Sequence, residues 1–147
     1  MRFQGKVYRD GRHWLAEVPI FDAMTQGRTR KEALSMIADW FETMADNDRM
    51  EVHVYARKGK DFEIGSADTR AMVSLLLRRR RELSGLSLAE VAERLGAKSR
   101  NAYARYERGS SAPTVEKLDE LLRAVSPDRD FVLRQARAPN ARERQSA

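Results

Sequence analysis

The sequence feature that most constrains the fold is a set of three glycines that divide the second half of the chain into short segments. Gly85, Gly96 and Gly109 each follow apolar residues at three- and four-residue spacing. Because glycine adopts the left-handed conformation that ends a helix, each of these positions predicts a helix C-terminus. We therefore expect a bundle of short helices over residues 67–126.

Capping signals predict where these helices begin. Asp68 or Thr69 can cap a first helix over residues 71–84, and Ser87-Leu-Ala-Glu90 is a capping box that opens a second helix through Leu95. A third helix is expected over about residues 100–108, and a fourth follows Pro113-Thr114. The residues expected to face inward are Met72, Leu75, Leu76, Leu83, Leu88, Val91, Ala92, Leu95, Ala102, Tyr103, Tyr106, Val115, Leu118, Leu121, Leu122 and Val125.

The third helix has a second face, opposite its packing face. Asn101, Ala104, Arg105 and Arg108 follow the spacing i, i+3, i+4 and i+7. Two short helices joined by a glycine turn, with an amide and arginines outward on the second, indicate a helix-turn-helix that enters the major groove of DNA. Arginine bridges guanine O6 and N7, and asparagine bridges adenine N6 and N7. The alternative is a four-helix packing module with a solvated arginine face.

Charge is divided unequally along the chain. Residues 1–66 carry 11 Lys+Arg and 11 Asp+Glu. Residues 67–147 carry 17 Lys+Arg, 15 of which are arginine, and 11 Asp+Glu, so the whole net charge of +6 lies in the second half. A basic half beside a neutral one suggests a module for a polyanion and another for a different partner. Ser87 and the loop of residues 109–112 offer contacts to phosphate.

Composition excludes several classes of protein. The chain has no cysteine, which excludes disulfides and Cys-ligated metal, and its longest apolar run, residues 72–77, is far shorter than the roughly 20 residues of a membrane span. The N-terminus has no apolar region typical of a signal peptide. With 41% hydrophobic residues the chain can form a packed core. We expect a soluble cytoplasmic protein that contacts no membrane.

The first half shows the alternation of apolar and polar residues that is typical of strands. Strands are predicted over residues 3–8 and 13–18, joined by a hairpin at Asp10-Gly11 and ended by Pro19, and a third over residues 23–25. Thr29-Arg-Lys-Glu32 predicts a capping box. The helix that it opens carries an apolar stripe to Ala45 and stops at Asn47 and Asp48. A strand over residues 51–55 follows, and residues 62–64 are expected to pair back, so the class is α+β.

Nothing in the first half predicts catalysis. His13 and His53 are the only histidines, and neither belongs to a metal-ligand spacing. Glu17, Asp22 and Glu51 are candidate metal ligands of a nuclease, but their spacing does not single them out. No phosphate-binding glycine loop or nucleophile elbow is present. We expect no catalytic residue, no metal and no cofactor, and a ribonuclease-H-like enzyme is the least favoured alternative.

Three strings of the first half resemble HicB-type antitoxins over residues 3 to about 57. They are Gly5-Lys-Val-Tyr, Gly11-Arg-His-Trp-Leu-Ala-Glu-Val-Pro and Thr25-Gln-Gly-Arg-Thr-Arg-Lys-Glu-Ala33. The family's P-D-L-P-G-x turn is replaced by Val18-Pro-Ile-Phe-Asp-Ala23, which is shorter and lacks the glycine. The resemblance implies a degenerate ribonuclease-H-like sheet without catalytic carboxylates. It also implies binding to a HicA-type toxin, a small mRNA-cleaving ribonuclease.

The second half resembles the Cro/phage-repressor (XRE) helix-turn-helix family over about residues 70–125. Gly85-Leu-Ser, Ala92-Glu-Arg-Leu-Gly96, Arg105-Tyr-Glu-Arg-Gly109 and Pro113 carry the resemblance. It implies base contacts by Arg100, Asn101 and Arg105, and an ion pair between Glu107 and Arg81. Ten residues separate Gly96 from Glu107 where the family has nine, so the recognition helix can start one position away. The predicted DNA-binding residues are Ser87, Ser99, Arg100, Asn101, Arg105 and Arg108.

These observations predict three segments: a HicB-like toxin-binding domain over residues 1–66, a helix-turn-helix domain over residues 67–126, and a tail over residues 127–147. In the tail we expect a short helix at Phe131-Val-Leu133 and disorder over residues 138–147. The predicted function is an antitoxin that binds its toxin and represses its own operon through operator double-stranded DNA. A homodimer or larger even assembly would read two half-sites. The alternative is a plain repressor whose N-terminal domain senses a ligand or oligomerises.

Overall fold

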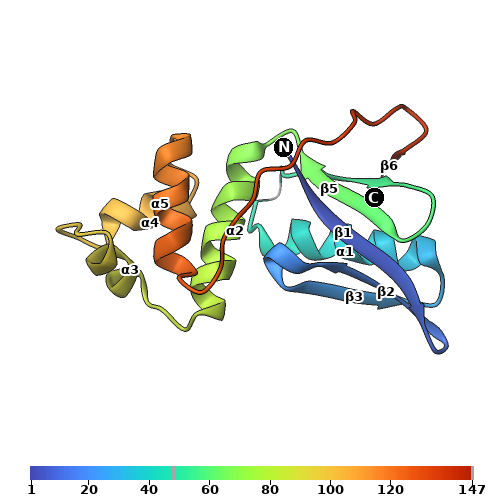
Figure 1. Ribbon diagram of the computed structural model, residues 1–147, viewed down its shortest axis with the longest axis horizontal. Coiled ribbons are helices and arrows are strands. Elements are labelled where there is room, and N and C mark those ends of the chain that lie inside the picture. Colours follow the sequence, from blue (N-terminus) through green and yellow to red (C-terminus); the bar gives the residue numbers. More distant parts are fainter. Residues whose placement is uncertain (48, 147) are drawn as a thin grey trace. The chain divides into compact units, whose positions relative to one another are not determined.

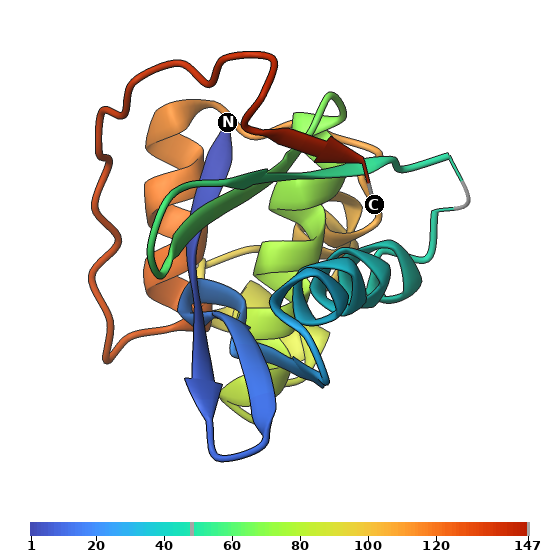
Figure 2. The ribbon, with the colours of Figure 1, turned by 90° about the vertical axis from the view of Figure 1, so that its right-hand side faces the viewer.

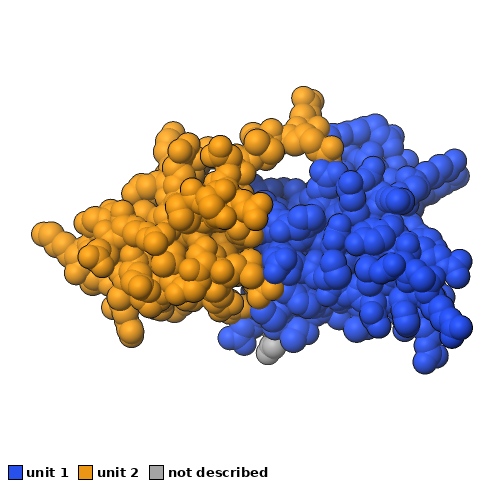
Figure 3. Space-filling model, turned by 60° about the horizontal axis from the view of Figure 1, so that its bottom comes forward, with its two compact units in different colours: residues 1–72, 136–147 blue, residues 73–135 orange. Residues whose placement is uncertain are grey.

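The computed structural model describes residues 1–47 and 49–146 in two compact units (Figure 3). Asp48, predicted at a helix stop, and Ala147, predicted in the tail, lie outside the described residues. The first unit contains residues 1–72 together with 136–147, and the second contains residues 73–135. We expected a division at residue 66 and a separate tail. The units instead divide between Met72 and Val73, and the end of the chain belongs with the first unit.

The first unit is an antiparallel sheet with one long helix, which confirms the predicted α+β class (Figures 1 and 2). The strands are β1 (Arg2–Asp10), β2 (His13–Val18), β3 (Ala23–Gly27), β4 (Val52–Ala56), β5 (Asp61–Ser66) and β6 (Arg144–Ser146). Their order in the sheet is β3-β2-β1-β5-β4-β6, and every neighbouring pair is antiparallel. The five strands predicted from alternation are therefore present, and β6 is an addition.

The core of the first unit lies between the sheet and helix α1 (Arg30–Met44). Phe21, which follows Pro19 in the short 3-10 helix η1 (Pro19–Phe21), makes edge-to-face contacts with the rings of Phe3 and Phe41, at centroid distances of 5.0 and 4.7 Å. Gly5 faces the same core, where a Cβ would lie 2.6 Å from ring carbon Cε1 of Phe62. The aromatic packing therefore requires glycine at this position of β1.

Two local predictions for this unit need correction. Asp10 pairs with His13, so the hairpin turn consists of Gly11 and Arg12, and not of Asp10 and Gly11. The Thr29 hydroxyl accepts the Glu32 N–H at 3.1 Å as predicted, but the Glu32 carboxylate accepts the N–H of Arg28 at 2.7 Å in place of that of Thr29. The carboxylate thus caps one residue earlier than in a standard capping box.

The second unit is built from short helices whose ends follow the glycines. The helices are α2 (Thr69–Leu83), which begins in the first unit, α3 (Leu88–Arg94), α4 (Asn101–Glu107) and α5 (Val115–Val125). Gly85 and Gly96 have φ of +68° and +66°. Two backbone hydrogen bonds close the helix end at each of these glycines. At Gly85 the Leu86 N–H donates to the Arg81 carbonyl, and at Gly96 the Ala97 N–H donates to the Ala92 carbonyl. The predicted helix ends are therefore confirmed.

Most residues predicted to face inward are buried or half-buried, with two exceptions at helix ends. Leu83 is exposed because α2 ends there and the chain turns at Gly85. Val115 is 82% exposed because it is the first residue after the Thr114 cap, ahead of the packed turns of α5. Ala104, predicted to face outward, is instead buried, in a helix that packs against α3.

The C-terminal segment differs most from expectation. Phe131, Val132 and Leu133 lie in an irregular segment in place of the predicted helix, and Val132 and Leu133 are 89% and 98% exposed. The segment expected to be disordered instead ends in β6, which pairs with β4. Strand pairing is made by the backbone, so a polar composition did not reveal it. Within the described residues, every helix is too short or too polar to cross a bilayer.

Candidate nucleic-acid interface

Helix α3 starts at a complete capping box, as predicted. The Ser87 Oγ accepts the Glu90 N–H at 3.1 Å, and Glu90 Oε2 accepts the Ser87 N–H at 2.7 Å. These hydrogen bonds lower the pKa of the Glu90 carboxyl because they stabilise its charged form. The Ser87 N–H is therefore already bound, and a phosphate at this helix end would meet a carboxylate.

Helix α4 separates a buried face from an exposed one. Tyr103, Ala104 and Tyr106 are buried. The six residues predicted to contact DNA are all exposed: Ser87, Ser99, Arg100, Asn101, Arg105 and Arg108. Among them, Asn101, Arg105 and Arg108 share one face of the helix by their spacing of four and three residues, because such residues are neighbours on a helix surface.

The start of α4 shows where the turn residues lie. Arg100 has helical backbone angles and occupies the position before Asn101, which is the first residue of the helix. Its carbonyl accepts the N–H of Ala104 at 2.9 Å, and the Ser99 carbonyl accepts that of Ala102 at 3.1 Å. Arg100 and Asn101 therefore stand at the N-terminus of α4, the part of a recognition helix that contacts base edges.

The Arg105 side chain is held in place by its neighbour Tyr106. The guanidinium carbon lies 5.0 Å from the centroid of the Tyr106 ring, and Nη2 donates to the tyrosine hydroxyl at 3.2 Å. Because the ring is buried, this contact restricts the arginine before any ligand binds, which lowers the entropy lost on binding. Residues i and i+1 do not face each other on an ideal helix, so no spacing rule predicted this pair.

A nearly buried ion pair fixes α4 against α2. Arg81 Nε and Nη2 donate to the two carboxylate oxygens of Glu107 at 2.6 and 3.0 Å, and Arg81 Nη1 donates to the Leu86 carbonyl at 2.8 Å. The bond to Glu107 raises the pKa of Arg81. Burial raises the pKa of the Tyr103 hydroxyl, with a further contribution from Glu107. The ion pair implied by the resemblance is thus confirmed.

The exposed surface of the turn and α4 is cationic. Residues 96–115 contain four cationic residues and a single acidic one, Glu107, whose side chain is only 7% exposed and is neutralised by Arg81. The cationic residues are Lys98, Arg100, Arg105 and Arg108, all exposed. Sequence reasoning did not include Lys98, although its place in the turn gave the signal. Helix α3 differs, because it exposes Glu90 and Glu93.

The loop after α4 has fewer groups free to contact a phosphate than the sequence suggested. The N–H groups of Ser110 and Ser111 both donate to the Arg105 carbonyl, at 3.0 and 3.3 Å. They close the end of α4, so the loop can offer a phosphate its hydroxyls but not these N–H groups.

The candidate metal ligands of the first unit do not converge. His53 is buried and its Nε2 lies 3.8 Å from Glu51, while Glu17 Oε2 accepts the Tyr8 hydroxyl at 3.5 Å. Asp22 closes the 3-10 helix in a left-handed conformation, with φ of +49°. Across the described residues no group of three or more histidine or acidic residues could hold a metal ion.

Comparison with known proteins identifies one region of the chain. Residues 77–125 match the helix-turn-helix family, of the Cro-type (XRE) class, from within α2 to the end of α5. The match covers α3, the turn and α4, and about a third of the chain. No curated protein matches the sequence. The match supports sequence-specific DNA binding in the regulation of transcription.

Proposed function

We propose that the chain is a repressor that reads an operator by placing α4 in the major groove. The observation that carries this proposal is the composition of the exposed face of α4, where Asn101, Arg105 and Arg108 stand beside one another and the one acidic residue is neutralised. Asparagine and arginine form bidentate hydrogen bonds with adenine and guanine, each worth about 1–3 kcal/mol of discrimination.

The exposed residues of the turn and of α4 have different tasks in this proposal. Arg100, Asn101 and Arg105 contact bases, and Lys98 and Arg108 contact phosphates on either side. Phosphate contacts fix the register of the helix and make affinity fall steeply with salt, whereas base contacts carry sequence information. A protein of this class reads two half-sites about one helical turn apart, so the proposal includes a homodimer or larger even assembly.

Variants in the full chain test this assignment with a labelled operator fragment. Arg105→Ala is expected to weaken binding to the operator more than to random duplex DNA, since it removes a base contact. Lys98→Ala is expected to weaken binding to both by the same factor and to reduce the salt dependence. An equal loss on both DNAs for Arg105→Ala would contradict the assignment of this arginine to a base.

We further propose that the first unit binds a HicA-type toxin and blocks it sterically, without chemistry of its own. The support is the HicB-like string at the junction of β3 and α1. The Thr25 hydroxyl donates to the Ala33 carbonyl at 3.0 Å, and a Cβ at Gly27 would lie 2.6 Å from the Ala33 nitrogen. The string thus builds the strand-to-helix connection, and it supports the fold that the family implies, a degenerate ribonuclease-H-like sheet.

Purification of the full chain from its native operon tests the antitoxin proposal. We expect a small basic protein with a histidine, encoded beside the chain, to copurify, and Arg105→Ala to leave this complex unchanged. A chain that binds its operator but captures no such protein would favour the plain repressor with a sensing or oligomerising first unit. Because operator binding requires the compartment of the DNA, the proposal keeps the cytoplasmic location predicted from the sequence.

A further inference from the structure

A buried serine lies in the most apolar stretch of α2. Residues 72–77 read Met-Val-Ser-Leu-Leu-Leu, and all of them are buried. A hydroxyl in such surroundings is cut off from water, so it needs a partner within the protein. Ser74 is 7% exposed, and its Oγ donates to the carbonyl of Tyr106 at 2.7 Å. The apolar run of α2 therefore makes a hydrogen bond to α4, the candidate recognition helix.

This hydrogen bond fixes the backbone at the end of α4. Tyr106 lies in the last turn of the helix, where carbonyls lack a partner further along the same helix. Its carbonyl also accepts the N–H of Gly109 at 3.3 Å. A Cβ at Gly109 would lie 3.4 Å from Ser74 Oγ, so a glycine leaves room for the serine hydroxyl. The carbonyl of Arg105 is held as well, by the N–H groups of the loop that follows.

The side chain of Tyr106 then directs that of Arg105. The tyrosine hydroxyl accepts Arg105 Nη2 at 3.2 Å, and the guanidinium carbon lies 5.0 Å from the ring centroid. The ring cannot follow the arginine, because Tyr106 is only 7% exposed. A guanidinium has more N–H groups than this one bond uses, and the others can still bridge guanine O6 and N7. The contact thus orients Arg105 without blocking it.

The other cationic side chains of this surface are not held in the same way. Within the part of the chain that the structure describes, the side chains of Lys98, Arg100 and Arg108 make no hydrogen bond or ion pair. Each of them must lose its freedom when DNA binds, which costs entropy. Among these described residues, Arg105 is therefore the one whose direction is set by the fold.

We propose that Tyr106 and Ser74 are positioning residues that make Arg105 the main determinant of operator specificity, at a guanine. Ser74 holds the backbone at the end of α4, and the Tyr106 hydroxyl sets the direction of the guanidinium. Random duplex offers Arg105 no fixed guanine edge, so the prior alignment favours the operator alone. This inference rests on the proposed base contact of Arg105 and extends it to two buried residues.

Tyr106→Phe in the full chain tests the proposal, because it keeps the buried ring and removes the hydroxyl. We expect the preference for operator over random duplex to fall about two- to tenfold, with binding to random duplex unchanged. Tyr103→Phe is the matched control, since it removes another buried hydroxyl from the same helix. It is expected to leave the preference unchanged. No change for Tyr106→Phe, or the same fall for both variants, would overturn the proposal.

A double-mutant cycle shows whether the hydroxyl acts through the arginine. In a chain that already carries Arg105→Ala, Tyr106→Phe is expected to cause no further loss of operator preference. The same loss in both backgrounds would contradict a positioning role. The cycle also separates this inference from the proposed function. If Arg105→Ala alone left the preference intact, the base contact itself would be wrong.

A measurement on the free protein tests the positioning without DNA. NMR relaxation of the Arg105 Nε–H group reports how ordered the guanidinium is on the picosecond to nanosecond timescale. Tyr106→Phe and Ser74→Ala should each lower this order, the first through the side chain and the second through the helix end. Arg123, whose Nε donates to Asp119 at 3.0 Å, is the internal control and should not change. An unchanged Arg105 signal in either variant would contradict the role given to that residue.

Discussion

Different kinds of contact stabilise the interior of each of the two units of this chain. The sheet unit has an aromatic core and long backbone ladders, such as the one that pairs β1 with β5 across most of the unit's sequence. The helical unit has short helices, glycine-closed ends and one ion pair that joins α2 to α4. The placement of α4 therefore depends on a buried ion pair as well as on its packed face, whereas the sheet unit depends on packing and backbone pairing.

Charge differs between the units in a way that the halves of the sequence did not show. Residues 136–147 bring three arginines and one glutamate to the sheet unit. The sheet unit then has 15 Lys+Arg and 13 Asp+Glu, and the helical unit has 13 Lys+Arg and 9 Asp+Glu. Both units are thus net positive. What distinguishes α4 is local, because its only acidic residue is neutralised by Arg81 while its arginines face outward.

The largest expected effect concerns the ion pair between Arg81 and Glu107 in the helical unit. Glu107→Ala leaves the nearly buried Arg81 without its partner, and we expect a loss of about 3–5 kcal/mol in the free energy of unfolding of the helical unit. Urea unfolding followed by circular dichroism measures it. The double variant Arg81→Met with Glu107→Leu should recover most of the loss, since apolar residues replace both charges. A double variant as unstable as the single one would contradict this account.

A smaller effect concerns the packing of Gly5 against the Phe62 ring in the sheet unit. Gly5→Ala places a methyl group against the Phe62 ring, which is fully buried and cannot move aside, so we expect a loss of about 1–3 kcal/mol. Thermal unfolding of the full chain measures it. Phe62→Leu added to Gly5→Ala should be less destabilising than the sum of the two single changes, because the shorter side chain leaves room for the methyl. Strict additivity would show that the close approach is not the cause.

The third expected effect concerns binding. Arg105→Ala should weaken operator binding by about 1–3 kcal/mol and change the stability by less than about 0.5 kcal/mol, because the side chain is on the surface. Fluorescence anisotropy with a labelled operator measures the affinity. Arg123→Ala, which removes an exposed arginine of α5 paired with Asp119, is the charge-matched control. The same loss for both variants would indicate a net-charge effect with no role for α4.

The smallest effect is the pH dependence of the capping box. Folding lowers the pKa of Glu90, so its contribution is present at pH values above the ordinary carboxyl pKa and is lost as the pH falls through the lowered value. The melting temperature of the natural chain should therefore exceed that of Glu90→Gln at neutral pH, and the difference should shrink in acid. A difference that stays constant with pH would show that the charge of the carboxylate is irrelevant to the cap.

Local signals predicted most of the secondary structure. Alternation placed the strands, and Ser87, Gly85 and Gly96 placed helix boundaries, because capping and left-handed turns depend on neighbouring residues alone. Helix ends were less predictable. Leu83 and Val115 fit an apolar stripe but lie beyond the packed turns, where the partner helix decides burial.

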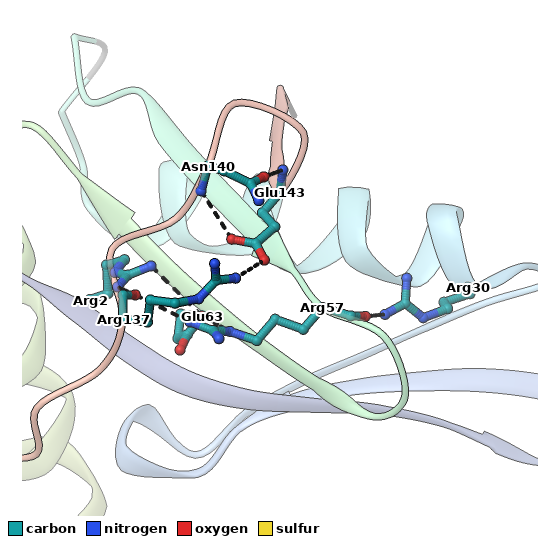
Figure 4. A network of polar contacts seen from close by, with 7 residues as sticks. All are labelled: Arg2, Arg30, Arg57, Glu63, Arg137, Asn140 and Glu143. Carbon is teal, nitrogen blue, oxygen red and sulfur yellow. Dashed lines mark hydrogen bonds and ion pairs between the residues drawn. The ribbon is translucent and has the colours of Figure 1, made fainter.

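The sequence did not predict most contacts between residues that are distant along the chain. Arg2 and Arg57 donate hydrogen bonds to the Arg137 carbonyl (Figure 4), whereas polar composition predicted disorder over residues 138–147. In the candidate site, helical spacing correctly predicted an exposed face with Arg105, but the hydrogen bond from Arg105 to Tyr106 follows from side-chain orientation. The Arg81–Glu107 pair was predicted through resemblance and not through spacing.

The central claim is that the exposed face of α4 binds DNA by sequence, and competition binding tests it most directly. The full chain is titrated onto the duplex upstream of its own reading frame at several salt concentrations, with random duplex as competitor. The account predicts binding at least about a thousandfold tighter to the upstream duplex, with affinity falling steeply as salt rises. Equal affinity for both duplexes, or no binding at low salt, would contradict it.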